Sequence, residues 1–138
     1  MTNPRILIVE DEAITALDEQ ECLEELGYEV VGIVDSGEDA IAKSGELRPD
    51  LVFMDITLAT EMTGQEAAWQ IREKFNIPVI FVTAKGNKLI YDAANYGHVT
   101  GYIIKPFEIE KLQENIEAAL RGKLNPTKNW TPVSQEQS

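Results

Sequence analysis

Four apolar residues followed by a carboxylate form the stretch Leu51-Val52-Phe53-Met54-Asp55. A short, continuous apolar run of this kind is typical of a strand buried on both faces of a parallel sheet. Three other apolar runs also end in polar groups: residues 6–9 in Glu10-Asp11, 79–82 in Thr83 and 102–104 in Lys105. The carboxyl ends of parallel strands meet at one edge of a sheet, so we expect these groups to share one crevice.

Strands and helices are predicted to alternate along the whole chain. Strand-length apolar runs fall at about residues 5–9, 29–34, 51–54, 78–82 and 101–104. Such an alternation, with right-handed crossovers, builds an α/β three-layer sandwich around a parallel sheet. The common five-strand solution is the flavodoxin-like doubly wound fold with strand order 2-1-3-4-5, whose switch point lies between strands 1 and 3. Asp11 and Asp55 follow those two strands, so the topology and the carboxylates select the same crevice.

The segments between the strands carry helix signals. A Glu-rich segment over 12–26 stops at Gly27, and its acidic residues Glu19, Glu21, Glu24 and Glu25 are expected on a solvated face. Ser36 and Thr63 begin capping-box patterns, which predict that two further helices start there. Helices are also expected over 108–121 and, with fewer apolar positions, over 87–96. We expect residues 1–122 to form one domain and the Pro-, Ser- and Gln-containing residues 123–138 to form a flexible tail.

Composition excludes several classes of protein. A chain of 138 residues is long enough for one domain with a sizeable core. Its net charge of -12 argues against nucleic-acid binding, which needs a basic patch. Cys22 is the only cysteine, which excludes an internal disulfide, and no apolar run is long enough for a membrane span. We therefore expect a cytoplasmic protein that binds neither nucleic acid nor membrane.

The predicted crevice has the groups that phosphoryl transfer requires. Two carboxylates about 4 Å apart repel each other by roughly 4 kcal/mol at an effective dielectric of 20, and a divalent cation would remove that repulsion. Oxygen ligands from Glu10, Asp11 and Asp55 favour Mg²⁺ over zinc. An Asp carboxylate is also a nucleophile toward phosphorus. In this interpretation Asp55 attacks, while Lys105 and Thr83 contact oxygens of the phosphoryl group.

These residues give the chain a specific resemblance between Arg5 and about Arg121. It resembles the receiver domain of two-component response regulators. The motifs that carry the resemblance are Ile6-Leu7-Ile8-Val9-Glu10-Asp11-Glu12, Phe53-Met54-Asp55-Ile56, Val82-Thr83-Ala84 and Tyr102-Ile103-Ile104-Lys105-Pro106-Phe107.

The resemblance implies a role for each matching residue. Asp55 would accept a phosphoryl group from a histidine kinase or a histidine phosphotransfer protein, with Mg²⁺ as cofactor. Asp11 and Asp55 would bind the metal directly, Glu10 through water, and Thr57 through its carbonyl. Thr83 and Tyr102 would form the switch pair, and the peptide bond before Pro106 would be cis.

The resemblance also bears on output and partners. A single-domain switch of this type is not an enzyme beyond its own phosphorylation and dephosphorylation. It would signal to an unknown downstream protein through residues 87–121, which are also a possible homodimer surface. The chain departs from the family in the loop after Asp55, where Ala59 replaces a common Pro and Gly64 falls one place late. The stretch 97–101 is also longer than the usual linker.

Alternative interpretations exist for single residues and for the function of the protein. Asp11 could cap a helix and Asp55 could be a turn residue, but packing alone does not require polar groups at four strand ends. An aspartyl-phosphate phosphohydrolase or phosphotransferase acting on small molecules is the alternative function. It would need a second catalytic Asp two residues after Asp55, where Thr57 stands. A nucleotide-binding module is disfavoured because Glu10-Asp11-Glu12 would repel phosphate.

Overall fold

The computed structural model describes residues 3–55, 62–84, 101–105 and 107–122. Five strands lie in this part: β1 (Arg5–Val9), β2 (Glu29–Val34), β3 (Leu51–Asp55), β4 (Val79–Ala84) and β5 (Gly101–Lys105). Four helices accompany them: α1 (Ala13–Glu25), α2 (Gly37–Leu47), α3 (Gly64–Phe75) and α5 (Ile109–Gly122). The helix expected over 87–96 lies outside the described residues. None of the four described helices combines the length and the apolar character that crossing a membrane requires.

The sheet has the predicted topology. Its five strands are ordered β2-β1-β3-β4-β5, and every neighbouring pair is parallel. The central strands β1 and β3 are almost fully buried, as their apolar runs predict. β2 was expected to be buried on both faces, but it is an edge strand with half-buried and exposed residues. An edge strand has a neighbour on one side only, so a continuous apolar run does not guarantee burial.

The helix boundaries follow local hydrogen bonding. The side chain of Ser36 accepts a hydrogen bond from the Asp39 amide, and that of Thr63 accepts one from the Glu66 amide, at 3.1 Å in both cases. Both N-caps were predicted from the sequence, and both are confirmed. α2 and α3 end in residues with a left-handed backbone, Arg48 and Asn76, whose amides donate to carbonyls one turn back. These caps turn the chain sharply into the next strand.

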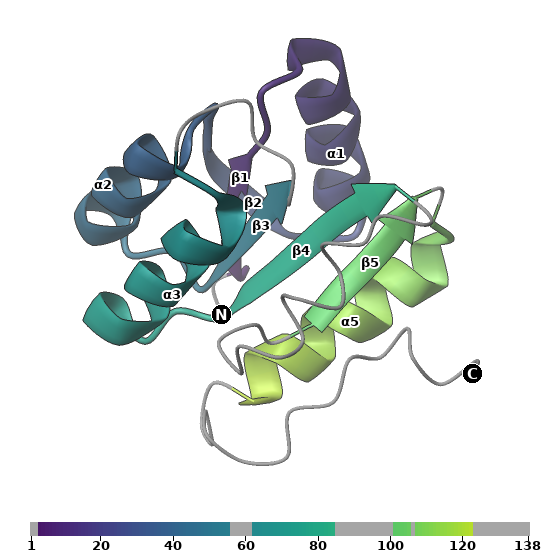
Figure 1. Cartoon of the computed structure of the whole chain (residues 1–138). Helices are drawn as coiled ribbons and strands as arrows, with labels where there is room; N and C mark the ends of the chain where they lie inside the picture. The colour runs from purple at the N-terminus through teal and green to yellow at the C-terminus, as the bar shows by residue number, and fades with distance from the viewer. Residues whose placement is uncertain (1–2, 56–61, 85–100, 106, 123–138) are drawn as a thin grey trace.

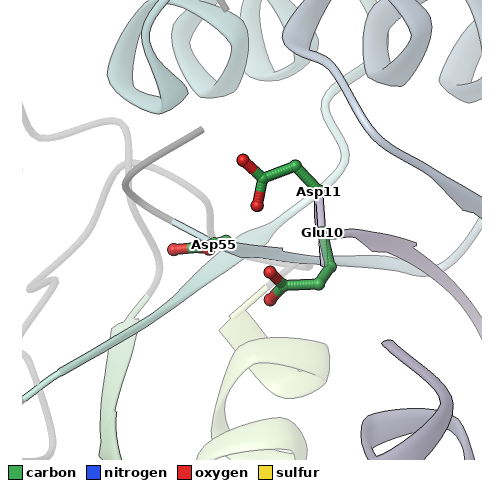
Figure 2. A group of neighbouring side chains, drawn as sticks. All are labelled: Glu10, Asp11 and Asp55. Atoms are coloured by element: carbon green, nitrogen blue, oxygen red, sulfur yellow. The ribbon is translucent and has the colours of Figure 1, made fainter. Parts of the chain in front are cut away.

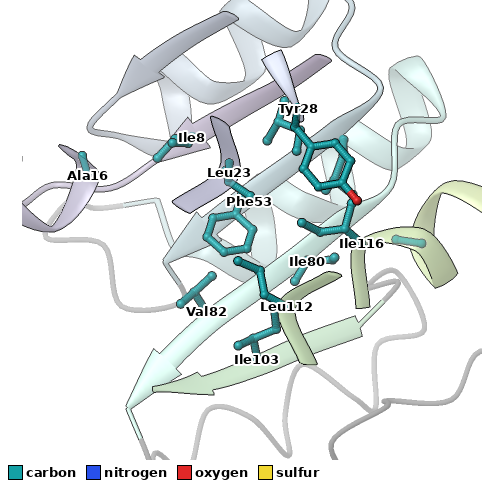
Figure 3. Close-up of a cluster of buried hydrophobic side chains, with 13 residues drawn as sticks. Ile8, Ala16, Leu23, Tyr28, Phe53, Ile80, Val82, Ile103, Leu112 and Ile116 are labelled. Carbon is teal, nitrogen blue, oxygen red and sulfur yellow. The ribbon is translucent and has the colours of Figure 1, made fainter. Parts of the chain in front are cut away.

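Two apolar cores lie on opposite faces of the sheet. Figure 1 shows α1 and α5 against one face and α2 and α3 against the other. The core on the α2–α3 side contains Val9, Met54 and Phe81 from the sheet. The core on the α1–α5 side contains Phe53 with Leu23 of α1 and Leu112 and Ile116 of α5, as Figure 3 shows. Alternate residues of each strand supply the two cores, because successive side chains of a strand point to opposite faces.

Candidate metal and phosphoryl-transfer site

Three carboxylates meet at the carboxyl edge of the sheet. Glu10 and Asp11 follow β1, and Asp55 is the last residue of β3. One carboxylate oxygen from each of the three lies within 4.8 Å of the other two. Figure 2 shows the three carboxylates extending toward the same side of the sheet edge. The sequence-based prediction that these groups share one crevice is therefore confirmed.

Strand pairing explains why residues 45 positions apart in the chain lie together. Val9 of β1 pairs with Met54 of β3 and, on its other side, with Val34 of β2. The residues that follow this row therefore emerge side by side at the edge of the sheet. The Glu10 amide donates a 2.9 Å hydrogen bond to the Val34 carbonyl, which extends the β1–β2 ladder by one residue. The Glu10 carboxylate accepts a 3.3 Å hydrogen bond from the Glu12 amide, which holds the turn into α1.

The raised pKa of Glu10 shows that this carboxylate is buried and that the neighbouring carboxylates repel each other. Its side chain is almost fully buried, whereas Asp11 and Asp55 are half-buried. Burial is the largest of the effects that raise the pKa of Glu10 from 4.5 to about 8. The negative charges of Asp55 and Glu19 and a side-chain hydrogen bond with Asp55 also raise it, while Lys105 lowers it. Within the described residues, the pKa of Glu10 therefore reflects burial, several carboxylates close together and one opposing ammonium.

Lys105 brings a positive charge to the same place. It is the last residue of β5, and β5 pairs with the end of β4 through Ala84. Its Nζ lies 3.9 Å from Oε1 of Glu10 and 3.9 Å from Oε2 of Glu19. The Lys105 side chain is 34% exposed, so it is only partly covered at this edge of the sheet. The sequence predicted Lys105 at this edge, and the structure places it there.

Glu19 is a site residue that sequence reasoning missed. It was expected on the solvated face of α1, but it is only 5% exposed and faces Lys105. Burial is the first cause that raises its pKa from 4.5 to about 7, with the charges of Asp55 and Asp18 adding and Lys105 opposing. The signal was its spacing: Ala16, Glu19 and Leu23 form the buried stripe of α1. By contrast, two apolar residues of the same helix, Ile14 and Leu17, are 79% and 60% exposed, so they do not belong to this buried stripe.

The residues present fit a divalent metal ion. Three converging carboxylates and no nitrogen or sulfur ligand in the described part of the crevice form the donor set that Mg²⁺ prefers. Oε1 of Glu10 is buried and makes no hydrogen bond within the described residues. An open hollow of about 320 Å³ borders Glu10 and Asp11 and carries two more carboxylates, Asp35 and Asp39. This edge of the sheet is therefore open beside Glu10 and Asp11 and strongly anionic.

Other predicted site residues lie at the limits of the described structure. The backbones of Thr83 and Tyr102 belong to β4 and β5, at the expected end and start of these strands. Their side chains lie outside the described part, so the predicted switch pair stays a prediction. Thr57, predicted as a carbonyl ligand, and Pro106, predicted to follow a cis peptide bond, also lie outside the described residues.

Comparison with known proteins decides the family. The family model described as "Response regulator receiver domain" matches residues 6–117 of the chain. The chain belongs to this family. This receiver chain has the predicted fold, and its relatives are regulators of two-component systems. Receiver domains accept phosphoryl groups in signalling, generally bind Mg²⁺ at an acidic pocket, and interact with histidine kinases and downstream targets.

Individual relatives support the assignment. The chain is 36% identical to the transcriptional regulatory protein PdtaR of Mycobacterium tuberculosis over 84% of its own length. It covers 56% of PdtaR, so it spans about half of that relative. It is also 36% identical to the chemotaxis protein CheY of Bacillus subtilis, of which it covers 97%.

Solved structures of receiver domains have the same fold as this chain. The signal receiver domain of a modulated diguanylate cyclase from Desulfovibrio desulfuricans superposes with a TM-score of 0.81 at 35% identity, covering 89% of this chain and 98% of that one. The response regulator domain of Thermotoga maritima CheB gives a TM-score of 0.76 at 26% identity, covering 86% and 97%. These relatives are signalling proteins, and they do not favour the phosphohydrolase alternative.

Proposed function

We propose that this receiver takes a phosphoryl group onto Asp55 from a phosphorylated histidine kinase or histidine phosphotransfer protein. An oxygen of the Asp55 carboxylate attacks phosphorus, the phosphorus–nitrogen bond of the phosphohistidine breaks, and the imidazole leaves with the bonding electrons and takes up a proton. The observation that supports this most strongly is the convergence of Glu10, Asp11 and Asp55 within 4.8 Å at the end of β1 and β3. A nucleophile needs such a fixed position more than it needs covalent help.

Each remaining residue has a part in this reaction. Asp11, Asp55 and the Thr57 carbonyl would hold Mg²⁺, with Glu10 acting through water, and the ion would supply positive charge to the carboxylates and to the transferred group. The Lys105 ammonium neutralises a phosphoryl oxygen from the β5 side, which its exposure and its place at the strand end support. The Thr83 hydroxyl donates to another phosphoryl oxygen. Thr83 and Tyr102 then report phosphorylation to the surface.

The phosphodonor docks beside the site. The start of α1 lines the hollow beside Glu10 and Asp11, and it exposes two large apolar side chains, Ile14 and Leu17. Exposed apolar residues on a helix next to the acceptor give a partner protein a surface to cover. Asp18 and Glu21, also exposed on α1, add negative charge that favours a basic partner surface.

The output is protein–protein contact. Residues 1–122 act as the receiver domain and 123–138 as a tail to it, in a cytoplasmic protein that is a switch and not an enzyme acting on other substrates. The downstream target binds residues 87–121, which also provide a possible homodimer surface.

Intact-mass measurement tests the proposal. The full chain is incubated with acetyl phosphate or phosphoramidate and Mg²⁺, and we expect a gain of one phosphoryl group that EDTA prevents. Asp55→Asn should lose this gain, whereas Glu114→Gln, which removes one exposed acid on α5 away from the three carboxylates, should keep it. An Asp55→Asn variant that gains phosphate as well as the wild type would refute the assignment. Transfer from a phosphorylated histidine phosphotransfer protein then tests the donor class.

A further inference from the structure

The buried carboxylate of Glu19 has a consequence for Lys105. Glu19 lies in the stripe of α1 that packs on the sheet, between Ala16 and Leu23, and these neighbours are 2% and 0% exposed. Burying a carboxylate in an apolar stripe is unfavourable unless a partner compensates it. The only ion pair of Glu19 in the described part of the chain is with Lys105. Within the described residues, the buried charge of Glu19 therefore depends on Lys105 for its compensation.

The geometry shows an ammonium shared between two buried carboxylates. Nζ of Lys105 is 3.9 Å from Glu19 Oε2 and 3.9 Å from Glu10 Oε1. A charge-assisted hydrogen bond would bring these atoms to about 2.8 Å. Both carboxylate oxygens are buried and make no hydrogen bond within the described residues. Lys105 is therefore attracted to both carboxylates without a tight contact to either.

A cation bound in the crevice would affect the charges of Glu10 and Glu19 differently. Glu10 belongs to the metal-binding group, so a cation in the crevice would neutralise its charge. Glu19 belongs to α1 and is not among the three converging carboxylates. Its attraction for Lys105 therefore persists when the metal is bound. An incoming phosphoryl group on Asp55 must compete with Glu19 for the same ammonium.

We propose that Glu19 is a positioning residue for Lys105, whose carboxylate holds the ammonium on the α1 side and so opposes phosphorylation of Asp55. This inference rests on the proposed function. Removing the charge of Glu19 frees Lys105 to contact the phosphoryl group, which favours the phosphorylated form. Removing it also lowers the negative potential that a dianionic phosphoryl group meets.

A double-mutant cycle tests the pair. The rate of phosphorylation by acetyl phosphate with Mg²⁺ is measured by intact mass for the wild type, Glu19→Gln, Lys105→Gln and the double variant. We expect Glu19→Gln to be phosphorylated roughly tenfold faster, and this gain to fall below about twofold when Lys105 is absent, since contacting residues couple in such cycles. Glu21→Gln removes an exposed charge from the same helix and should change the rate by less than about twofold.

Two further measurements separate positioning from a structural effect. Glu19→Met fills the apolar stripe with a residue of similar length and no charge, so it should match Glu19→Gln if charge is the cause. Affinity for beryllium trifluoride with Mg²⁺, measured by calorimetry, should rise in both variants without any phosphoryl turnover. Thermal unfolding shows that the variants are folded.

The outcomes distinguish the two proposals. If the wild type gains no phosphoryl group on Asp55, the proposed function fails and this inference fails with it. If the wild type is phosphorylated but Glu19→Gln behaves like Glu21→Gln, only the inference about Glu19 is wrong. The same holds if the effect of Glu19→Gln is equally large without Lys105.

Discussion

Asp55→Asn should stabilise the protein in the absence of Mg²⁺, although it removes the proposed phosphoacceptor. The substitution keeps the size of the side chain and removes one of three charges whose oxygens lie within 4.8 Å of each other. At that distance and an effective dielectric of 20, two unit charges repel by about 3.5 kcal/mol. Asp11 and Asp55 are half-buried, so solvent and salt reduce the net gain to about 1 to 2 kcal/mol.

The measurement is thermal unfolding followed by circular dichroism. It is made at pH 9, above the pKa of about 8 of Glu10, so that Glu10 carries its charge. In EDTA, the melting temperature of Asp55→Asn should exceed that of the wild type by roughly 3 to 8 °C, the shift that this free energy gives in a domain of this size. Addition of Mg²⁺ at constant ionic strength should stabilise the wild type by about 1.4 kcal/mol at ten times its dissociation constant, and Asp55→Asn by much less.

Glu114→Gln is the control, because Glu114 is exposed on α5 and lies outside the converging group. It removes the same unit of charge and should shift the melting temperature little, with the Mg²⁺ response intact. The reasoning fails if Asp55→Asn melts no higher than the wild type in EDTA. It fails equally if Mg²⁺ raises both melting temperatures by the same amount, because the carboxylate would then play no part in binding the ion.

Three further predictions concern Glu19, a helix cap and the core. Because the folded-state pKa of Glu19 is about 7 and its ordinary value is 4.5, folding takes up a proton between these pH values. The free energy of unfolding should therefore fall as pH rises from 4.5 to 7, and Glu19→Gln should remove about 2 to 3 kcal/mol of that fall in urea titrations; parallel pH curves would contradict this. Ser36→Ala deletes the hydrogen bond to the Asp39 amide and should lower the free energy of unfolding by about 1 kcal/mol, whereas Ser36→Asp should preserve it. Phe53→Ala leaves a cavity in the α1–α5 core and should lower it by about 3 to 5 kcal/mol in the same assay, and a loss below about 1 kcal/mol would show that the site collapses around the missing ring.

The sequence contained most of the fold because its signals were local and consistent. The apolar runs predicted all five strands, and the side-chain oxygens of Ser36 and Thr63 predicted two helix starts. The order 2-1-3-4-5 is the common solution for five such strands, and it predicts that Asp11 and Asp55 lie together at the switch point. A polar residue at a strand end is informative because topology decides where that end lies.

The burial of β2 and of Glu19 was not predicted from the sequence, because it depends on which other elements cover each face of a strand or helix. β2 has an apolar run but lies at the sheet edge, where it pairs with a strand on one side only. In α1 the acidic residues looked alike, yet Glu19 alone of the predicted acidic set shares the stripe of Ala16 and Leu23. Burial of that carboxylate becomes understandable only when Lys105 of β5, distant in the chain, is placed beside it. Periodicity could have located the stripe, but it could not have supplied the partner.

The two cores are separate, so the helices on one face of the sheet are supported by different side chains from those on the other face. The Phe53 core supports the layer of α1 and α5, which carries Glu19, while α2 and α3 rest on a different set of side chains across the sheet. The exposed face of α3 can therefore be changed, to carry a new binding surface or a fluorescent label, without altering the core that supports Glu19, whereas α2 places Asp39 beside the hollow at Glu10. The strands β1 and β3 are the exception, because they contribute side chains to both layers and carry the carboxylates at their ends.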